Sequence, residues 1–322
     1  MVEKRTVGSL VTLFLGRGVM SIMSNGDPMH GSAGAEFGGN VSIVIPARNE
    51  AAGLRTILPK IAALTGIAEV IVVNDGSIDD TAAVCAEFKV GMVRHLYAMG
   101  NGAAIKAGAR AATGQVIVFM DADGQHQPED IPRLLEKLAE GYDMAVGARG
   151  DGSQASVHRG LANKLYNQLA SWMVGQEIAD LTSGFRAVKA DRFRQFMYLL
   201  PNGFSYPTTI TMSFFRAGYA LAYVPIHAPK RIGDSHLRLV RDGVRFLLII
   251  FKIGTLYSPL KLFFPISLAF FTLGAGHYLY TFLTLHRFTN MSALLFITSV
   301  LVFLVGLVSE QITSLSYRDS ER

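Results

Sequence analysis

The sequence contains little cysteine and little charge. Of its 322 residues only Cys85 is cysteine and only 17% are charged, whereas 50% are hydrophobic. A single cysteine excludes an intrachain disulfide framework and a cysteine zinc site, and we expect Cys85 to be a buried, inert thiol. So low a charge content is unusual for a purely soluble protein. Because the apolar excess lies mostly after residue 244, we expect a soluble body with a membrane-bound tail.

Two phosphate-binding motifs are also missing. The chain has no Walker A sequence, and "MGNGAAIKAG" (99–108) lacks the G-x-G-x-x-G pattern of a dinucleotide-binding fold. We interpret this segment as the start of a helix, in which Lys106 is solvated. No histidine or cysteine stands out as a catalytic base or nucleophile.

The formal net charge is +5 at pH 7. A basic chain suits either nucleic acid or an anionic membrane surface. Several basic residues lie close to the hydrophobic tail, namely Lys230, Arg231, Arg238, Arg241, Arg245 and Lys252. Their position favours the membrane, and we expect no nucleic-acid partner.

Residues 1–39 differ from the rest of the chain. "VEKRTVGSLVTLFLG" (2–16) has a basic start and a short apolar run, like a signal peptide. No small-residue cleavage site follows closely, however, and Arg17 interrupts the apolar region. "SNGDPMHGSAGAEFGGN" (24–40) has the composition of a disordered linker. Two interpretations stay open: a mobile leader that touches the membrane surface, and an upstream start codon.

A different pattern begins at Val41. "VSIVI" (41–45), "EVIVV" (69–73) and "VIVFM" (116–120) are short apolar runs rich in valine and isoleucine. Such runs are typical of parallel strands that are buried on both faces. Helical stretches lie between them, and "PEDIPRLLEKLAEG" (128–141) is the clearest, with Pro128 in its first turn. The alternation predicts an α/β domain with a mostly parallel sheet over residues 40–236.

The tail contains two apolar runs. Leu262 to Leu285 is uncharged and would be about 36 Å long as a helix, which is enough to span a bilayer. "HRFTN" (286–290) separates it from a second uncharged run, Met291 to Ser309. We therefore predict a two-helix transmembrane hairpin over residues 259–314. His277 lies in the first span, and we expect it to form an interhelical hydrogen bond rather than to contact a lipid substrate.

The charges that flank the hairpin predict its orientation. Basic residues lie before the first span, between Arg241 and Lys261, and Arg318 follows the second. The positive-inside rule places both ends in the cytoplasm, so residues 315–322 form a cytoplasmic tail. Residues 237–258 include "VRFLLIIFKIGTLY" (244–257), which is too short and too charged to span. We expect this juxtamembrane region to lie along the membrane interface.

Polar residues follow the predicted strands where each one ends. Asp121 and Asp123 come directly after 116–120, and Asp75 follows 69–73. In α/β sheets ligands bind at the carboxyl ends of the strands. Carboxylate and amide oxygens suit Mg²⁺ or Mn²⁺, which commonly arrives with phosphates. A surface turn that caps the next helix is the alternative for Asp121 and Asp123, and a turn or N-cap role is the alternative for Asp75.

The motifs together resemble glycosyltransferase family 2, whose catalytic domain has the nucleotide-sugar-binding GT-A fold. The resemblance rests on "SIVIPARNE", "VVNDGSIDDT", "NGAAIKAGARAATG", "DADGQHQPEDI", "VGAR" and "DLTSGFRA", in that order. It runs from about Val41 to Ser235. Within the family the chain is similar to dolichyl-phosphate mannose synthase and the bacterial polyprenyl-phosphate glycosyltransferases, whose bacterial members carry a membrane hairpin and act on undecaprenyl phosphate.

The resemblance implies a nucleotide site at the first two strand ends. Asp75 is implied to contact the base of the nucleotide. Pro46, Arg48 and Glu50 are implied to shape the pocket around it.

The resemblance also implies roles at the later strand ends. Asp121 is implied to face the sugar-nucleotide, and Asp123 and Gln125 are implied to bind the metal, Mg²⁺ or Mn²⁺, at the diphosphate. In "DLTSGFRA", Asp180 is implied to lie near the transferred sugar and the acceptor, while Arg186 braces the loop.

Basic residues of the family contact the acceptor phosphate. Arg149, at the end of "DMAVGAR", and Arg159 match them, and guanidinium groups suit phosphate oxygens because they form paired hydrogen bonds. A surface or salt-bridge arginine is the alternative for each. "PKRIGDSHLRL" is similar to the family's R-x-G-x-S-K segment through Arg231 and Ser235, but His236 stands in place of the lysine.

The implied reaction is the inverting, metal-dependent transfer of a sugar from a nucleotide diphospho-sugar to polyprenyl phosphate at the cytoplasmic face of the inner membrane. The product would serve cell-envelope glycan synthesis or modification. A UDP-sugar is expected on family frequency alone. The resemblance leaves open whether the chain forms a homo-oligomer, although some relatives assemble as tetramers.

Three alternatives to this reaction stay open. A processive polysaccharide synthase carries a Q-x-x-R-W motif, whereas "QLASW" (168–172) lacks the arginine. A transferase acting on a lipid hydroxyl needs a base, for which Asp180 is the only candidate. An inactive nucleotide-binding membrane scaffold is a third alternative, and the intact acids argue against it.

Overall fold

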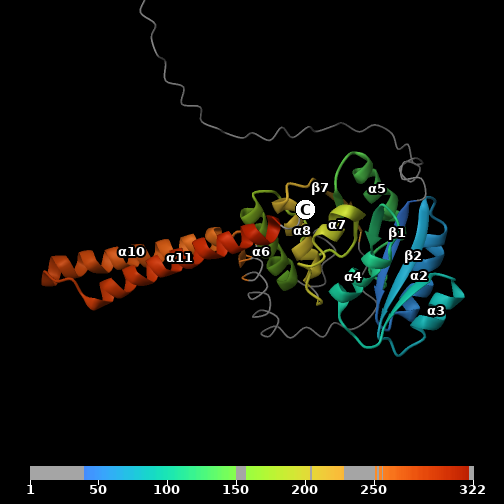
Figure 1. The fold of residues 1–322 in the computed structure, drawn as a ribbon, viewed down its shortest axis with the longest axis horizontal. Helices are drawn as coiled ribbons and strands as arrows, with labels where there is room; N and C mark the ends of the chain where they lie inside the picture. The colour runs from blue at the N-terminus through green and yellow to red at the C-terminus, as the bar shows by residue number, and fades with distance from the viewer. Residues whose placement is uncertain are drawn as a thin grey trace, which may run out of the picture. The chain divides into compact units, whose positions relative to one another are not determined.

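The predicted sheet is present and contains seven strands. The structure, a computed structural model (Figure 1), describes residues 40–149, 157–203, 205–227, 251, 254–255 and 257–318. Its strands are β1 Val41–Ala47, β2 Ile67–Asp75, β3 Gly91–His95, β4 Val116–Phe119, β5 Met144–Arg149, β6 Arg186–Lys189 and β7 Leu221–Ile226. The three strands expected from the sequence are β1, β2 and β4. All of β4 and all of β1 except Pro46 are buried, and in β2 the residues from Ile71 to Asp75 are buried. Burial on both faces explains why these runs lack the alternation of a half-exposed strand.

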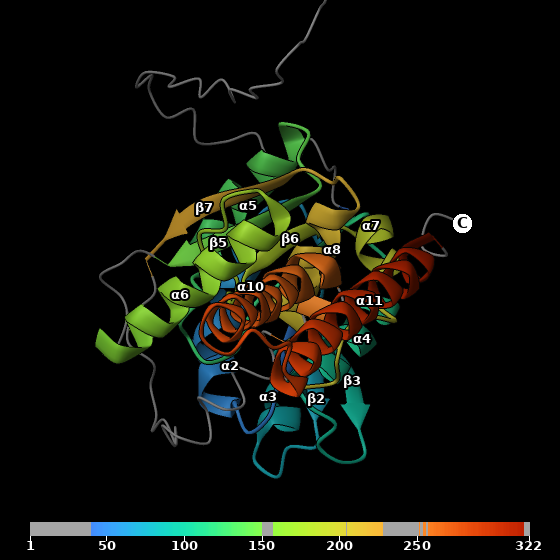
Figure 2. The ribbon, with the colours of Figure 1, turned by 90° about the vertical axis from the view of Figure 1, so that its left-hand side faces the viewer.

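The strands are arranged in the order β3-β2-β1-β4-β6-β5-β7, so that β3 and β7 form the two edges (Figure 2). The pairs β1–β2, β1–β4, β2–β3 and β5–β7 are parallel. β6 runs antiparallel to both of its neighbours, β4 and β5. The sheet is therefore mostly parallel, as expected, with one reversed strand in its interior.

Helices cover both faces of the sheet. Between residues 40 and 227 they are α2 Ala51–Ala62, α3 Thr81–Glu87, α4 Asn101–Ala111, the 3₁₀ turn η1 Pro128–Asp130, α5 Ile131–Ala139, α6 Val157–Val174, α7 Ala190–Gln195 and α8 Tyr206–Arg216. The core on one face contains buried side chains of α4, α6, α7 and α8, and the core on the other face contains those of α2, α3 and α5. The result is a three-layer α/β/α domain (Figures 1 and 2).

Two local predictions are confirmed inside these layers. The helix expected over 128–141 begins as η1 and continues as α5, whose Ile131, Leu134, Leu135 and Leu138 are all buried. Cys85 in α3 is buried, and burial raises the pKa of its thiol. A buried thiol of raised pKa is a poor nucleophile, as the sequence predicted.

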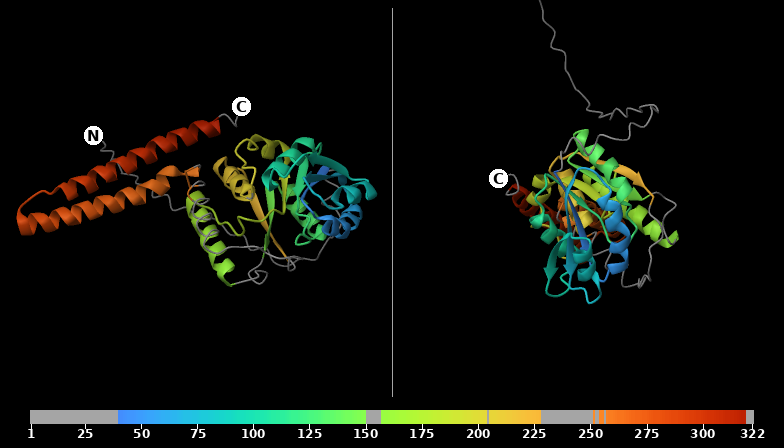
Figure 3. Two further views of the ribbon diagram at one scale, coloured as in Figure 1. Left: turned by 90° about the horizontal axis from the view of Figure 1, so that it is seen from below. Right: turned by 90° about the vertical axis from the view of Figure 1, so that its right-hand side faces the viewer.

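The tail forms two long helices, α10 Pro259–Leu285 and α11 Asn290–Arg318, which lie side by side (Figures 1 and 3). Both are long and apolar enough to cross a membrane, and only 11% and 17% of their most apolar windows are buried. A core helix of a soluble protein would be mostly buried instead, so the exposed apolar surface favours lipid as its surroundings. Most of the juxtamembrane region 237–258 lies outside the described residues, as do 1–39 and 319–322.

Polar groups join the two apolar helices. His277 of α10 forms a hydrogen bond with Ser292 of α11, Nδ1 to Oγ 3.0 Å, which confirms the interhelical bond expected for this histidine. Ser267 and Ser299 each donate to the other's backbone carbonyl at 2.9 Å. Gly274 allows close approach, because a Cβ atom there would lie 3.1 Å from the Leu295 Cβ. Small residues and interhelical hydrogen bonds are the usual means by which helices associate in lipid.

Candidate functional site

The topology brings the predicted site residues to one edge of the sheet. β1, β2 and β4 are parallel, so the residues after Ala47, Asp75 and Phe119 emerge on the same side. β6 is reversed, and its first residue, Arg186, pairs with Phe119. The loop that leads into β6 therefore reaches the same edge, and so does Arg149 at the end of β5. One antiparallel strand thus adds a further loop to the edge where α/β proteins bind ligands.

The turn after β4 presents two carboxylates. Asp121, Asp123 and Gln125 are all partly exposed, whereas Ala122 between the two acids is buried. Gly124 has a positive φ of 77°, which lets the chain reverse direction after Asp123. The Asp123 carboxylate accepts a hydrogen bond from the Gln125 backbone N–H at 3.1 Å. Both acids are consequently held at the surface of the edge rather than on opposite faces of a strand.

The buried side chain of His126 supports this turn, a role that the sequence did not indicate. The Asp121 backbone N–H donates to its Nδ1 at 2.9 Å, and its ring stacks on Phe185 with centroids 5.0 Å apart. Complete burial lowers the pKa of His126 to about 4. A neutral ring that accepts a backbone hydrogen bond through Nδ1 is a structural support for the turn.

Gly53 in α2 approaches the same turn. A Cβ atom at this position would lie only 1.9 Å from the carbonyl oxygen of Ala122, which belongs to the backbone between the two acids. No feature of "NEAAG" indicated this contact, because it joins residues that are remote in sequence. Only glycine lets α2 pack this closely against the turn.

We predict that Gly53→Ala destabilises the fold by about 1–3 kcal/mol, the usual cost of overpacking. We also expect it to reduce any metal-dependent activity of the turn, because the backbone between Asp121 and Asp123 must shift. Gly203→Ala is the matched control, since a Cβ atom there meets nothing within 4 Å. Chemical denaturation in detergent would measure both variants, and wild-type stability and activity for Gly53→Ala would contradict the prediction.

Arg149 and Asp180 form the strongest ion pair of the site. Arg149 Nε donates to Asp180 Oδ2 at 2.8 Å, and Nη2 donates to Asp180 Oδ1 at 3.1 Å and to Thr182 Oγ1 at 2.7 Å. The Asp180 side chain is only 9% exposed and that of Arg149 is 29% exposed. Arg149 Nη1 has no hydrogen-bond partner among the residues that the structure describes. The guanidinium is therefore held rigidly through two of its three nitrogens.

Asp180 also receives hydrogen bonds from its own loop. Its Oδ1 accepts from the backbone N–H groups of Thr182 at 3.0 Å and Ser183 at 3.1 Å, and from the Thr182 hydroxyl at 3.0 Å. Burial opposes ionisation, but these bonds and the charge of Arg149 hold the pKa of Asp180 below its ordinary value. Burial likewise opposes a charged Arg149, yet Asp180, Asp121 and Asp123 keep the pKa of the guanidinium above its ordinary value.

The depressed pKa of Asp180 predicts how stability responds to pH. A carboxylate whose pKa is lower in the folded state contributes stability that is present above the ordinary value of about 4 and is lost as the pH falls through the folded-state pKa. We therefore expect the difference in unfolding free energy between wild type and Asp180→Asn to stay constant from pH 7 to pH 5. Denaturant titrations across this range would test it. A wild-type advantage that grows as the pH falls through this range would mean a raised pKa and a carboxyl group able to act as a base.

Arg186 lies beneath the same loop and is completely buried. It donates to the carbonyl oxygens of Ser183 and Pro207 and to the Thr211 hydroxyl, which agrees with the expectation that it braces the loop. Burial lowers the pKa of its guanidinium, while the charges of Asp180 and Asp121 oppose that shift. Arg186 thus places a buried positive charge under the two acids and ties the loop to the start of α8.

Asp75, at the end of β2, stabilises the turn between β3 and α4. Its carboxylate accepts hydrogen bonds from the backbone N–H groups of Met99 and Gly100, both at 2.8 Å, and lies 2.7 Å from His95 Nδ1. Burial opposes ionisation, but these bonds hold the pKa of Asp75 below its ordinary value. Much of its hydrogen-bonding capacity is used inside the protein, which fits the alternative of a turn aspartate. The nucleobase contact of Asp75 stays a prediction.

The ends of β1 and β2 are joined by side chains. Pro46 pairs with Val73, and Ala47 pairs with Asn74, so Arg48 and Glu50 lie beside the turn that follows Asp75. Asn49 has a positive φ of 57°, and its side-chain carbonyl accepts from the Ile78 backbone N–H at 2.9 Å. The predicted nucleotide-pocket residues thus lie together, with Arg48 exposed and Glu50 partly exposed.

The side chains of three residues predicted to bind the acceptor lie outside the described part of the structure. Arg159 belongs to the first turns of α6, but its side chain is outside the described part. Arg231 and Ser235, with His236, fall in 228–250, which the structure does not describe. Arg149 is therefore the one member of the predicted phosphate-binding set whose contacts are described.

The donor set at the edge fits a hard divalent cation. Asp123 and Gln125, with Asp121 beside them, offer carboxylate and amide oxygens on one exposed turn. Within the described residues no group of three or more histidine, cysteine, aspartate or glutamate side chains could hold a metal ion. Mg²⁺ and Mn²⁺ sites in phosphate-binding proteins need few protein ligands, because the phosphates and water complete the coordination. The residues present are thus sufficient for a metal that arrives with a diphosphate, and insufficient for an all-protein cage.

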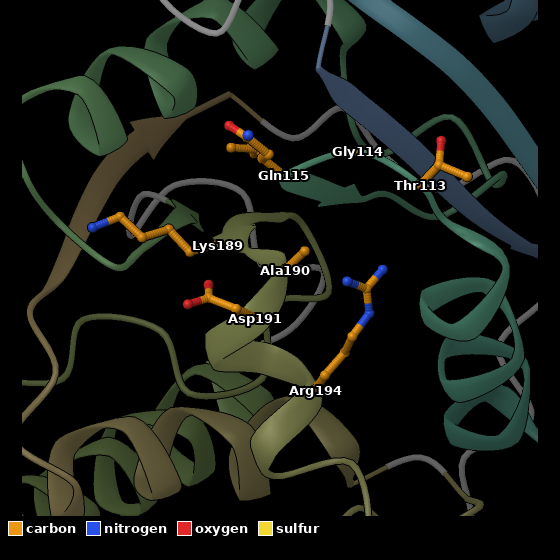
Figure 4. A pocket seen from close by; sticks show the side chains of 8 residues that line it. Thr113, Gly114, Gln115, Lys189, Ala190, Asp191 and Arg194 are labelled. Carbon is orange, nitrogen blue, oxygen red and sulfur yellow. The ribbon is translucent and has the colours of Figure 1, made fainter.

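A separate cavity of ≈ 430 Å³ lies at the other end of β4 (Figure 4). Its lining contains Thr113, Gly114, Gln115, Val116, Lys189, Ala190, Asp191 and Arg194. Arg194 donates to the carbonyl oxygens of Ala109 and Ala112, and Lys189 pairs with Asp143 at 3.0 Å. Because its cations are used inside the protein and it is remote from the carboxylate edge, we assign it no ligand.

Comparison with known proteins agrees with this geometry. Residues 42–196 match the family model for Glycosyl transferase family 2, and residues 258–315 match the GtrB C-terminal hairpin. The chain carries a glycosyltransferase family 2 domain. The matched region of this domain runs from β1 to the end of α7 and contains both the carboxylate turn and the Arg149–Asp180 pair. The hairpin match coincides with α10 and α11, and together they indicate a membrane protein.

Two relatives illustrate the range of similarity to this chain. An undecaprenyl-phosphate 4-deoxy-4-formamido-L-arabinose transferase of Klebsiella pneumoniae is 32% identical over 62% of this chain, and the alignment spans 63% of the relative's length. The glycosyltransferase AglJ of Haloferax volcanii is 26% identical, with 88% of this chain and 96% of the relative aligned. The chain thus spans less than two thirds of the Klebsiella relative.

The fold of the glycosyltransferase domain also occurs in solved structures. A glucosyl-3-phosphoglycerate synthase from Mycobacterium tuberculosis, in complex with Mn²⁺, UDP and glucosyl-3-phosphoglycerate, superposes with a TM-score of 0.58. The match covers 71% of this chain and 85% of that one, with 22% sequence identity. At this identity the comparison supports the fold, which is the GT-A type expected from the sequence.

Proposed function

We propose that this protein transfers a sugar from a nucleotide diphospho-sugar to a polyprenyl phosphate, such as undecaprenyl phosphate, and releases the nucleoside diphosphate. The product would be a polyprenyl-monophosphate-sugar used in cell-envelope glycan synthesis or modification. The observation that carries the proposal is the single edge on which Asp121, Asp123 and the Arg149–Asp180 pair meet, in a chain that ends in an apolar hairpin. The Klebsiella relative is an undecaprenyl-phosphate sugar transferase, which supports the same class of acceptor for this chain.

A phosphate acceptor suits the chemistry of this edge. An acceptor phosphate oxygen is already ionised near neutral pH, so it attacks the anomeric carbon without a general base. The carbon–oxygen bond to the acceptor forms as the bond to the donor diphosphate breaks, and in-line attack inverts the anomeric carbon. Asp180 is saturated with hydrogen bonds and has a depressed pKa, which makes it a poor base. Arg149 Nη1 can hold the acceptor phosphate in place, so orientation supplies much of the rate.

The carboxylate turn would hold a divalent cation. Asp123 and Gln125 would ligate Mg²⁺ or Mn²⁺, and Asp121 would face the sugar-nucleotide. When bound, the ion stabilises the negative charge that develops on the leaving diphosphate. The M. tuberculosis structure contains Mn²⁺ and UDP, which favours a divalent ion and a UDP-sugar for this chain as well. Pro46, Arg48, Glu50 and Asp75 would form the nucleotide pocket, and Arg159, Arg231 and Ser235 would complete the phosphate site.

We place the catalytic edge at the cytoplasmic face of the inner membrane. Basic residues flank the apolar helices on the side of the catalytic domain, and these favour the cytoplasm. Both ends of the hairpin, and hence the catalytic domain, would lie on that side.

An acceptor competition tests the proposal against its nearest rival. The rival is transfer to a lipid hydroxyl, for which Asp180 would have to act as the base. Detergent-purified protein with a donor would be offered undecaprenyl phosphate, undecaprenol and diacylglycerol in equal amounts. We expect product from the phosphate alone, and product from a hydroxyl lipid would overturn the proposed acceptor. Nucleotide binding without transfer to any acceptor would favour an inactive scaffold.

A further inference from the structure

The exposed side of α6 ends in the only tryptophan of the chain. Lys164, Gln168 and Trp172 follow one another at intervals of four residues, so they share one side of the helix, and all three are exposed. Trp172 is 52% exposed, whereas its neighbour Met173 is buried. Among the described residues the indole N–H has no hydrogen-bond partner. The exposed side of α6 thus ends in a large aromatic ring whose N–H has no acceptor in the described part of the structure.

This end of α6 contacts the start of the first apolar helix. Lys261, in the first turn of α10, donates from Nζ to the Met173 carbonyl oxygen at 2.9 Å. A Cβ atom at Gly254 would lie 3.1 Å from Leu262 and 3.4 Å from the Met173 side chain, so these residues pack together. Trp172 is therefore one residue away from the carbonyl that binds the base of the hairpin.

On the hairpin, the change from polar to apolar surface lies close to Lys261. Glu310 of α11 pairs with Arg216 at 3.6 Å and accepts from the Leu260 backbone N–H at 3.3 Å. Beyond these charged groups most exposed side chains are apolar, beginning with Phe264 on α10 and Val308 on α11, while Thr272 and Thr284 are exposed polar exceptions. A charged base followed by exposed apolar residues is the pattern expected where a helix enters a bilayer.

We propose that Trp172 lies in the phospholipid headgroup layer, so that the end of α6 contacts the membrane in addition to the two spans. Tryptophan favours this layer because its ring is apolar while its N–H still needs an acceptor. The inference rests on the membrane part of the proposed function.

The contact at Trp172 is connected to the candidate site through α6. Asn167, five residues earlier on the same helix, donates to the Ala179 carbonyl at 2.7 Å and accepts from the Leu181 backbone N–H at 3.2 Å. These two bonds hold the residues on either side of Asp180. A tryptophan fixed in the headgroup layer would therefore set the depth at which the Arg149–Asp180 pair meets a lipid phosphate.

Intrinsic fluorescence tests the proposal without a label, because Trp172 is the only tryptophan. The full chain would be reconstituted into phosphatidylcholine–phosphatidylglycerol vesicles that contain lipids brominated either near the start or near the end of their acyl chains. We expect bromines near the headgroup to reduce Trp172 emission more strongly than deep bromines. Emission that no brominated lipid reduces would overturn the proposal, and so would stronger reduction by the deep bromines.

Two single-tryptophan controls in a Trp172→Phe background calibrate the depth. Phe271→Trp, in the middle of α10, should be quenched most by deep bromines, and Tyr97→Trp, on the exposed turn after β3, should not be quenched. If Phe271→Trp is quenched and Trp172 is not, the proposal is wrong while the hairpin is in the membrane. If neither is quenched, the hairpin is not in the bilayer, and the membrane part of the proposed function is wrong as well.

Discussion

Replacing Asp123 with asparagine is expected to lower sugar transfer at least about 100-fold, which corresponds to about 2.7 kcal/mol of transition-state stabilisation. The exchange removes one negative charge from the turn after β4 but keeps the size of the side chain. Asp123 is partly exposed, so the fold should not depend on its charge. Initial rates of transfer would be measured over a range of Mn²⁺ and Mg²⁺ concentrations. We expect the variant to need more metal and to remain slow at saturation.

Asp191→Asn is the matched control for Asp123→Asn. Asp191 is an exposed acid at the start of α7, beside the cavity at the other end of β4. The same chemical change at this position should leave both the rate and the metal dependence unaltered. The metal assignment would be refuted if Asp123→Asn kept the wild-type rate, or if an excess of chelator left the wild-type enzyme fully active.

Replacing Arg149 with alanine is expected to have an effect of similar size, for a different reason. The change removes the guanidinium proposed to bind the acceptor phosphate, and loss of one such donor lowers turnover on the order of 10²–10³-fold. It also leaves the carboxylate of Asp180 without its cation. Because Asp180 keeps its hydrogen bonds from Thr182 and Ser183, we expect a loss of about 2 kcal/mol in stability rather than unfolding.

Arg149→Lys separates charge from geometry. Lysine keeps the positive charge but cannot form the paired bonds to Asp180 and Thr182 while presenting another nitrogen to a ligand. We expect its stability to lie close to that of wild type, and its Michaelis constant for the lipid phosphate to be clearly raised.

Lys189→Ala is the control for Arg149→Ala, because it breaks the Lys189–Asp143 pair away from the carboxylate edge. It should lower stability without affecting transfer. Normal turnover in Arg149→Ala would contradict the proposed role of this arginine.

The features that local sequence determines were predictable. The apolar runs at 41–45 and 116–120 became central strands because their side chains are buried on both faces. The two apolar runs of the tail form α10 and α11, and His277 in the first span forms a hydrogen bond with Ser292 in the second. In each case one physical requirement, burial of apolar surface or satisfaction of a polar group in lipid, acts directly on the residue concerned.

Features that depend on strand order were not predictable in this way. No local pattern shows that β6 is antiparallel, yet this reversal places the loop of Asp180 beside Arg149. The contact of Gly53 with Ala122 and the support of Asp121 by His126 likewise depend on packing between elements. The resemblance to glycosyltransferase family 2 supplied candidate residues at this edge, and only the topology shows which of them meet.

The mass of the lipid product tests the central claim most directly. Purified protein would be incubated with undecaprenyl phosphate, Mg²⁺ or Mn²⁺, and a panel of UDP-, GDP- and TDP-sugars, and the lipids would be analysed by mass spectrometry. The proposed reaction predicts a lipid that is heavier by one sugar residue and still carries a single phosphate. A lipid that gained a sugar together with a second phosphate, or an acceptor left unchanged by every donor, would contradict it.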